Sequence, residues 1–262
     1  MSVNPLPITI KAISDDHLVS FLRCPYQFYY QYLLKLDSYQ VKWRQLVQSV
    51  INQVIRHFHQ LPPTEQHKVS ILKLVDSYWK NVSPQVFESR QHYYMVLAQT
   101  TDHLLQLLTK RKKQNPPLFL YRKINTYVEE LETNLSLTYD LAKWRSQSFS
   151  VTKYLVEADE EMIELYQHLM VVFSYKAFNK LPEEIEVITL LEGKSYLCSP
   201  TEENYTQGIM YLQYMKNMLL NPGEYVKTDS QAECSSCPFI HRCNGNNSNF
   251  SKKSKSEENF LH

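Results

Sequence analysis

The amino-acid sequence predicts a mixed α/β fold of the α+β type, formed by residues 13–245 as a single domain. Apolar residues recur at helical spacing through residues 13–115, whereas short β-rich runs separated by polar turns fill most of residues 116–200. Residues 201–245 return to a helical pattern and end in a segment with three cysteines. A length of 262 residues and a hydrophobic fraction of 43% suit one large domain with a substantial core.

The N-terminal region is expected to contain four helices. The first covers residues 15–36, with Ser14 as its N-cap and Pro25 as a kink or restart point. The second covers residues 41–60, where apolar side chains form one stripe along the helix. Residues 65–113 show two further helical patterns.

The β-rich region is expected to begin after two consecutive prolines at 116–117. Four strands are predicted, at residues 118–124, 126–131, 135–143 and 149–156, and they suggest a β-meander. A helix at 159–179, a strand pair at 186–191 and 194–198, and a helix at 203–219 follow. The polar, low-complexity tail at 246–262 is predicted to be disordered.

Overall charge and hydropathy exclude some classes of function. The 28 basic residues nearly balance the 27 acidic ones, so any basic surface must be local. No secretory signal is visible at the N-terminus, and apolar runs such as 169–173 are too short to span a bilayer. We therefore expect a cytoplasmic protein without a membrane partner. Only four glycines occur, the first at Gly193, which excludes a Gly-rich catalytic loop upstream of it.

The cysteine pattern near the C-terminus indicates a metal or cluster site. Cys234, Cys237 and Cys243 have C-x2-C-x5-C spacing, and thiols in the cytosol stay reduced. A tetrahedral set needs a fourth thiolate, and the remaining candidates are Cys24 and Cys198. Cys198 ends an apolar run and reads as a core residue. Taken alone, Cys24 also reads as a core residue, although Pro25 and the neighbouring aromatic residues would suit it to a shielded cluster.

Two segments carry a resemblance to a known family. ISDDHLVSFLRCPYQFYYQYLL near the N-terminus and CSSCPFIHRC near the C-terminus resemble the iron–sulfur-containing AddB-type nuclease domains and the CRISPR-associated RecB-like exonucleases. The resemblance implies a restriction-endonuclease-like PD-(D/E)XK core with an N-terminal helical region and a C-terminal four-cysteine clamp.

The same resemblance implies a [4Fe–4S] cluster. Its ligands would be Cys24, Cys234, Cys237 and Cys243, which would join the two ends of the domain. Four thiolates also suit zinc, which stays the alternative. Compact zinc sites more often use two close C-x-x-C pairs, so one remote cysteine with a trio favours the cluster.

The family's nuclease site allows a test for catalysis. It uses Gly-x-x-x-His, Gly-x-x-Asp, (Asp/Glu)-x-Lys and Gln-x-x-x-Tyr elements, whose carboxylates bind Mg²⁺ and whose lysine stabilises developing charge. In the first element, Gln48 and Asn52 stand at the Gly and His positions. In the second, Asp140 is retained while Leu137 replaces the glycine.

The third and fourth elements are incomplete. If Lys153 is the catalytic lysine, the acid position holds Val151; in the alternative register Lys153 takes the acid position and Leu155 the lysine position. The fourth element keeps Gln167, with Val171 at the tyrosine position. Asp140, Lys153 and Gln167 are therefore expected to be remnants of a catalytic site. A rearranged pair of Lys153 and Glu157 on one strand face is the alternative.

The expected function is DNA processing or repair by a catalytically degenerate, nuclease-like protein that binds DNA or serves a partner. The resemblance implies a helicase-type protein partner, and Mg²⁺ is expected only if the nuclease site is active. The sequence KRKK, comprising Lys110, Arg111, Lys112 and Lys113, is a candidate DNA contact, as are basic residues near Tyr121 and Trp144. The alternatives are an active metal-dependent DNA exonuclease or endonuclease and a structural or redox-sensing adaptor.

Overall fold

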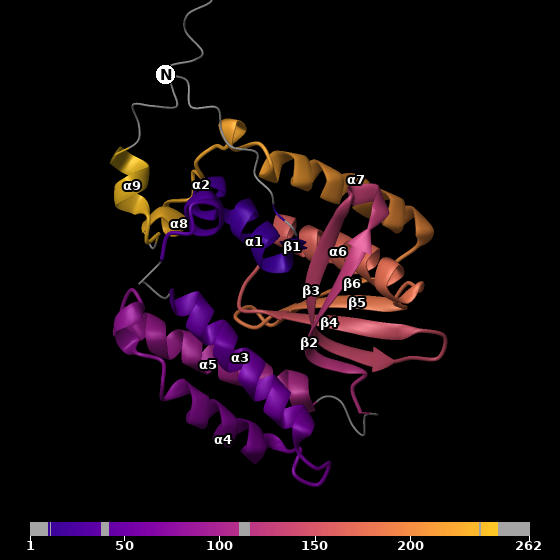
Figure 1. The fold of residues 1–262 in the computed structure, drawn as a ribbon. Coiled ribbons are helices and arrows are strands. Elements are labelled where there is room, and N and C mark those ends of the chain that lie inside the picture. The colour runs from indigo at the N-terminus through magenta and orange to yellow at the C-terminus, as the bar shows by residue number, and fades with distance from the viewer. Residues whose placement is uncertain (1–9, 11, 38–41, 110–115, 236, 246–262) are drawn as a thin grey trace, which may run out of the picture.

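The computed structural model describes residues 10, 12–37, 42–109, 116–235 and 237–245. A six-stranded mixed sheet lies between two groups of helices (Figure 1). The KRKK sequence and the tail at 246–262 lie outside the described residues. No helix in the described ranges is both long enough and apolar enough to cross a lipid bilayer.

The N-terminal segment, expected as one helix that is kinked or restarted at Pro25, forms three short helices. A short strand, β1 (Ala12–Ser14), which was not predicted, precedes them. The helices are α1 (Asp15–Arg23), α2 (Pro25–Phe28) and the π-helix η1 (Tyr29–Leu33). Ser14 is the N-cap, as predicted, since its hydroxyl accepts a hydrogen bond from the backbone N–H of His17 at 3.2 Å. A new helix begins at Pro25, because the backbone of Cys24, the residue before this proline, is extended.

The next helices cover one face of the sheet. They are α3 (Trp43–Gln60), α4 (Lys68–Trp79) and α5 (Arg90–Thr109), with a single 3₁₀ turn, η2 (Pro84–Val86), between the last two. The predicted apolar stripe of α3 is confirmed, because its members Val47 to Phe58 are buried. They pack with α4, α5 and the sheet residues Leu141 and Tyr154 in one apolar cluster.

The first part of the sheet corrects one expectation. The predicted runs 118–124 and 126–131 form one strand, β2 (Phe119–Val128), followed by the 3₁₀ turn η3 (Glu129–Leu131). Asn125 pairs with Ser136 in register, so this polar residue does not end the strand. β2, β3 (Thr133–Trp144) and β4 (Phe149–Leu155) are joined antiparallel in succession, as a meander requires.

The second part of the sheet follows α6. The elements are α6 (Glu160–Phe178), β5 (Glu184–Thr189), β6 (Lys194–Cys198) and α7 (Glu202–Leu219). β5 pairs parallel with β4 and antiparallel with β6. α1, α6 and α7 pack on the face of the sheet opposite α3.

The C-terminal segment returns to the N-terminal helices. After η4 (Pro222–Glu224), the short helices α8 (Gln231–Ser235) and α9 (Ile240–Gly245) lie beside α2 (Figure 1). The two ends of the described chain are therefore brought together.

The strand register opens a gap in the sheet. One edge of β3 pairs with β1 through residue 136 and with β4 from residue 141 onward. Between these two pairings, residues 137–140 of β3 face the point where β1 turns into α1 and where β4 separates from β3. Asp140, Lys153 and the start of α1 therefore meet at this gap.

Candidate functional site

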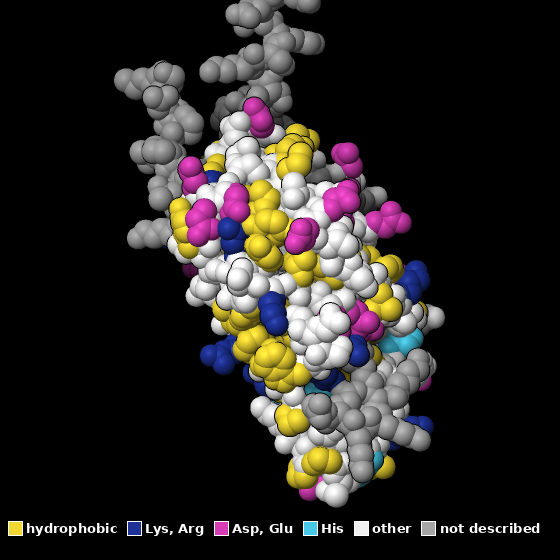
Figure 2. Space-filling model, turned by 90° about the vertical axis from the view of Figure 1, so that its right-hand side faces the viewer, with side chains coloured by type: hydrophobic (Ala, Val, Ile, Leu, Met, Phe, Trp, Pro, Cys, Tyr) yellow, Lys and Arg dark blue, Asp and Glu magenta, His cyan; other side chains and the backbone are white. Residues whose placement is uncertain are grey.

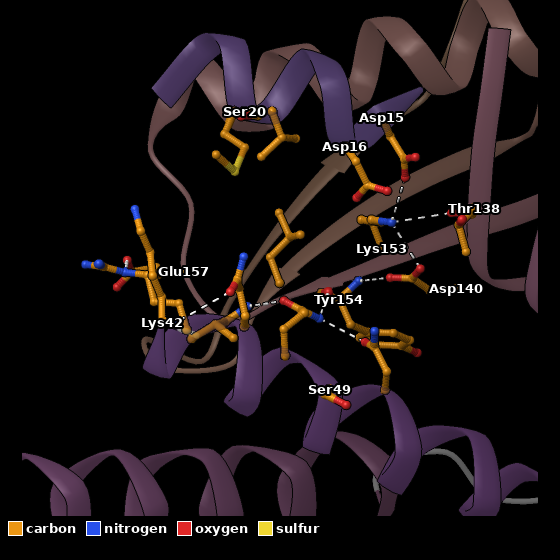
Figure 3. A pocket seen from close by; sticks show the side chains of 18 of the residues that line it. Asp15, Asp16, Ser20, Lys42, Ser49, Thr138, Asp140, Lys153, Tyr154 and Glu157 are labelled. Carbon is orange, nitrogen blue, oxygen red and sulfur yellow. Dashed lines mark hydrogen bonds and ion pairs between the residues drawn. The ribbon is translucent and has the colours of Figure 1, made fainter. Parts of the chain in front are cut away.

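A polar cavity of about 710 Å³ lies over the gap in the sheet, between α1 and α3. Its floor is formed by β3 and β4, and one wall is completed by α6. Figure 3 shows polar side chains around it, among them Asp16 of α1, Asp140 of β3 and Lys153 of β4. Among the lining residues are Asp15, Asp16, Arg23, Lys42, Arg44, Gln48, Asn52, Arg56, Asp140, Lys153, Glu157 and Tyr166.

Asp140 is buried on the floor of the cavity, and protein donors engage both of its carboxylate oxygens. Oδ1 accepts a hydrogen bond from Lys153 Nζ at 3.1 Å, and Oδ2 accepts one from the backbone N–H of Tyr154 at 2.9 Å. Burial raises the pKa of Asp140, and the Lys153 ammonium opposes this shift. The carboxylate thus ties β3 to β4 at the point where the strands separate.

Lys153 lies between two carboxylates. Its Nζ contacts Asp140, the backbone carbonyl of Thr138 at 3.4 Å and Asp15 Oδ2 at 3.5 Å, and it lies over the ring of Tyr166. Burial alone would lower the pKa of Lys153, but the neighbouring carboxylates, Asp140 above all, raise it overall. The ammonium is therefore charged at neutral pH.

The contact of Lys153 with Asp140 is compatible with the register in which Lys153 is the lysine of the third element. In that register the position of the strand acid holds Val151. Val151 is fully buried in the apolar cluster beneath α6. This strand therefore supplies no second carboxylate at that position.

α3 contributes an amide in place of a titratable group. Gln48 donates to the carbonyl of Tyr154 at 2.8 Å and accepts from the backbone N–H of Val156 at 2.9 Å, which fastens α3 to the end of β4. It also donates to Asn52 Oδ1 at 2.9 Å. The predicted Gly and His positions are thus occupied by a hydrogen-bonded amide pair facing the cavity.

Two other predicted residues are not part of the Asp140 centre. Gln167 does not line the cavity, while the adjacent Tyr166 does, because one residue turns the side chain by about 100° around a helix. Glu157 lines the cavity but lies beyond the end of β4, where it pairs with Arg44 of α3. The proposed strand pair of Lys153 and Glu157 is therefore not formed.

Sequence reasoning missed one residue of the site. Asp15, 4% exposed, comes from the first turn of α1, where acidic residues commonly serve the helix itself. Tyr121 does not line the cavity. It lies opposite Asp140 in a stretch of β2 where pairing with β3 is interrupted, and its φ of 45° is unusual for a non-glycine residue. Its hydroxyl is buried, and Arg56 lies over one face of its ring.

Basic side chains are distributed unevenly around the protein. Arg23, Lys42, Arg44 and Arg56 line the cavity, although Arg44 pairs with Glu157 and Lys42 pairs with Glu233. On the described face seen in Figure 2, acidic side chains lie mainly in the upper part, and Lys and Arg side chains are scattered lower down. This face carries no continuous basic surface.

A second cavity, of about 210 Å³, is lined by four cysteines. They are the four predicted from the sequence, Cys24, Cys234, Cys237 and Cys243. Cys198 lies on β6 and does not line it. Burial raises the pKa of the Cys237 and Cys243 thiols. Within the described part of the chain, no group of three or more His, Cys, Asp or Glu side chains is arranged to hold a single metal ion.

A buried ion pair separates the two cavities. Lys42 Nζ at the start of α3 contacts Glu233 Oε2 at 3.1 Å and donates to Gln27 Oε1 at 3.2 Å. Glu233 precedes the first cysteine of the C-terminal trio, and Gln27 lies on α2. The Lys42 side chain thus connects the cysteine segment with the helix that forms one wall of the larger cavity.

Comparison with known proteins agrees with this architecture. A family model of the PD-(D/E)XK nuclease superfamily matches residues 12–169, which include α1, the gap in the sheet, Asp140 and Lys153. The solved structure titled "Crystal structure of SSO0001" is 11% identical, with 91% of this chain and 88% of that chain covered at a TM-score of 0.39. A likeness this distant adds nothing to the assignment. No curated protein matches the chain. The family match and the strand arrangement that it covers show that this chain belongs to the PD-(D/E)XK nuclease superfamily.

Proposed function

We propose that this protein binds DNA and acts in DNA processing or repair without cutting DNA by itself, directly or as the subunit of a larger machine. The observation that carries this proposal is that the Lys153 ammonium is held by ion pairs with Asp140 and Asp15. In addition, the buried Val151 stands where the family motif has an acidic residue. A cytoplasmic location fits the five cysteines of the chain, since thiols there stay reduced.

The arrangement argues against metal-dependent cleavage. A hard cation such as Mg²⁺ needs several oxygen ligands, and the strand that should supply a second carboxylate supplies an apolar side chain. Asp140 is already held by Lys153 and by a backbone N–H. Lys153 is 7% exposed and faces carboxylates, so its ammonium is not placed to stabilise charge on a phosphate. The chain therefore keeps the fold of the nuclease superfamily but lacks the residues needed for metal-dependent cleavage of DNA.

DNA binding is supported by the cations at the mouth of the cavity. Arg23 and Arg56 line it and make no ion pair with an acidic residue among the described contacts, so both can contact phosphates. Trp144, 61% exposed at the end of β3, offers a ring for stacking on an unpaired base. Phosphate contacts of this kind make affinity fall with salt but require no divalent ion.

A [4Fe–4S] cluster is proposed for the cysteine cavity, with Cys24, Cys234, Cys237 and Cys243 as its ligands. The support is that all four thiols line one cavity. A zinc ion, the alternative, would draw its four sulfurs to about 2.3 Å from one centre, whereas a cluster spreads its ligands over four irons. When bound, the cluster supplies a covalent link between the two ends of the domain.

A protein partner, of helicase type by family resemblance, is also part of the proposal. Met210, Tyr214 and Met218 are spaced one turn apart on α7 and are 69%, 62% and 36% exposed. Exposed apolar side chains that gather on one helix face are typical of interaction surfaces. This stripe is a suitable place for a second subunit.

Fluorescence anisotropy with labelled single- and double-stranded DNA tests the proposed function. The purified protein should bind in EDTA, with an affinity that falls steeply as salt rises. Absence of binding to either DNA at low salt would refute the proposal and leave the structural or redox-sensing adaptor. The iron content and visible spectrum of the anaerobically purified protein test the cluster, and zinc without iron would refute it.

The second candidate is a metal-dependent DNA nuclease with a rearranged site. It is favoured by one observation: Asp15, Asp140 and Lys153, two acids and a lysine, still meet in one cavity. DNA cleavage that requires Mg²⁺ or Mn²⁺ and is abolished by Asp140→Asn in the folded protein would establish it.

A further inference from the structure

The outward face of α7 carries no charge over most of its length. Lys216 is the sole charged residue from Asn204 to Leu219, and it lies on the opposite side of the helix from Tyr214, where its ammonium donates to the carbonyl of Leu131. The exposed positions are occupied by Thr206, Gln207, Met210, Tyr214, Asn217 and Met218. A helix face in water normally carries charged side chains, whereas the centre of a protein interface is poor in charge and rich in Tyr and Met. This composition is typical of a face that another chain covers.

Acidic side chains border the α7 stripe, which we define as Met210, Tyr214 and Met218. Glu203 is exposed and precedes Met210 by seven residues, so it lies on the same side of the helix at the N-terminal end of the stripe. On the flank toward α6, the His168 ring stacks on Tyr211 with 4.8 Å between the ring centroids. Glu164 Oε1 contacts the Nε2 atom of that histidine at 3.4 Å. The border of the stripe is therefore acidic at one end and along one flank.

This negative border disfavours two kinds of occupant. Burial raises the pKa of Tyr211 to about 12, and the charges of Glu164 and Glu161 add to this shift, so both carboxylates act on the flank of the stripe. DNA is disfavoured because its phosphates would be repelled. A second copy of this chain is disfavoured as well, since a twofold axis would bring each acidic border against itself.

The dimensions of the α7 stripe suit a single helix. The eight residues from Met210 to Met218 span about 12 Å along α7. This length matches the anchors at i, i+4 and i+7 with which an amphipathic helix packs on an apolar surface. A standard interface between two folded proteins takes roughly 20–30 residues from each side, which is far more than the stripe provides. The stripe is therefore suited to a short helical segment.

We propose that the α7 stripe docks a basic amphipathic helix of a partner protein. Its apolar side chains pack on Met210 and Tyr214, and its Lys or Arg side chains pair with Glu164 and Glu203. The inference rests on the proposed function, which includes a protein partner, and it adds the chemistry of the contacting segment. Figure 1 shows α7 and α3 on opposite sides of the sheet, and no residue of α7 lines the larger cavity. The partner helix therefore leaves the mouth of that cavity open to DNA.

Fluorescence anisotropy with two labelled synthetic peptides tests the proposal on the purified, full-length protein. Both peptides have the same amphipathic pattern of leucines, and their polar positions are all lysine in one and all glutamate in the other. The protein should bind the lysine peptide on the order of tenfold more tightly, because two or more ion pairs replace repulsion. Glu164→Gln/Glu203→Gln should remove most of this preference.

Met210→Ala/Tyr214→Ala should weaken binding of the lysine peptide on the order of tenfold, since it removes the apolar anchors. Tyr94→Ala/Met95→Ala removes a tyrosine and a methionine that are similarly exposed on α5, so it is the matched control and should leave binding unchanged. Equal affinity for the two peptides, or an equal loss in the control variant, overturns the proposal.

Two further results would assign the stripe to another occupant and also overturn the proposal. One is self-association in analytical ultracentrifugation that Met210→Ala/Tyr214→Ala abolishes. The other is weaker DNA binding by this variant at an unchanged melting temperature. Failure of the wild type to bind DNA in EDTA would contradict the proposed DNA binding, whereas the preference for the lysine peptide reports on the α7 stripe alone.

Discussion

Replacement of Asp140 by alanine should destabilise the protein strongly, because this carboxylate satisfies two buried groups. Asp140→Ala removes the 3.1 Å contact with Lys153 and the 2.9 Å hydrogen bond from the Tyr154 N–H. An unpaired buried N–H costs about 1–3 kcal/mol. Breaking a buried ion pair costs about 3–5 kcal/mol when the remaining charge has no other partner.

The total loss should stay moderate because Asp15 remains 3.5 Å from Lys153 Nζ and retains part of the charge compensation. We therefore expect the free energy of unfolding to fall by about 3 kcal/mol for Asp140→Ala and by about 1 kcal/mol for Asp15→Asn. In a chain of this size, the first value corresponds to a melting temperature lowered by about 6–12 °C.

Urea unfolding of the purified protein, followed by circular dichroism, measures these changes. Asp76→Ala, at an exposed position on α4, is the matched control and should change stability little. If Asp140→Ala were no more destabilising than Asp76→Ala, the carboxylate would not be the buried connection between β3 and β4 described above.

Other perturbations test the cysteine cavity and the DNA surface. Cys24→Ala should lose iron and thermal stability, whereas Cys198→Ala should keep its iron; equal iron retention in both would show that the fourth ligand was wrongly assigned. Lys42→Met leaves Glu233 without its buried cation and should speed the loss of iron to a chelator. An unchanged rate of iron loss would show that the Lys42–Glu233 ion pair does not stabilise the cysteine segment. Arg56→Ala should weaken DNA binding and reduce the salt slope by about one unit, and an unchanged slope would exclude it as a phosphate contact.

The parts of the fold that depend on local periodicity were predictable from sequence. The buried stripe of α3 and the N-cap at Ser14 are present as expected. The short strand β1 was not predicted, because three residues carry too little periodic signal and its pairing partner is distant in the chain. The unbroken strand at Asn125 was also missed, since partner pairing there outweighs a weak local preference.

The site was predictable only where a family motif marks the residue. Asp140 and Lys153 were identified by the motif, and the structure brings them into contact. The motif indicates Gln167, but the adjacent Tyr166 lines the cavity, because a motif in the sequence does not fix which face of a helix packs against the site. Asp15 carried no signal, since an acidic residue in a first helical turn has an ordinary local explanation. Asp15 reaches Lys153 because β1 pairs with β3 and so places the start of α1 beside the gap in the sheet. This pairing joins residues that are far apart in the sequence.

Incubation of the purified protein with labelled single- and double-stranded DNA in Mg²⁺ or Mn²⁺ tests the central claim most directly. The account predicts that DNA is bound but not cleaved, because Lys153 is held by Asp140 and Asp15 and an apolar side chain, Val151, stands at the position of the strand acid. Asp140→Asn should then show no difference in products from the wild type. Divalent-ion-dependent degradation by the wild type, abolished in a folded and iron-loaded Asp140→Asn variant, would contradict the claim.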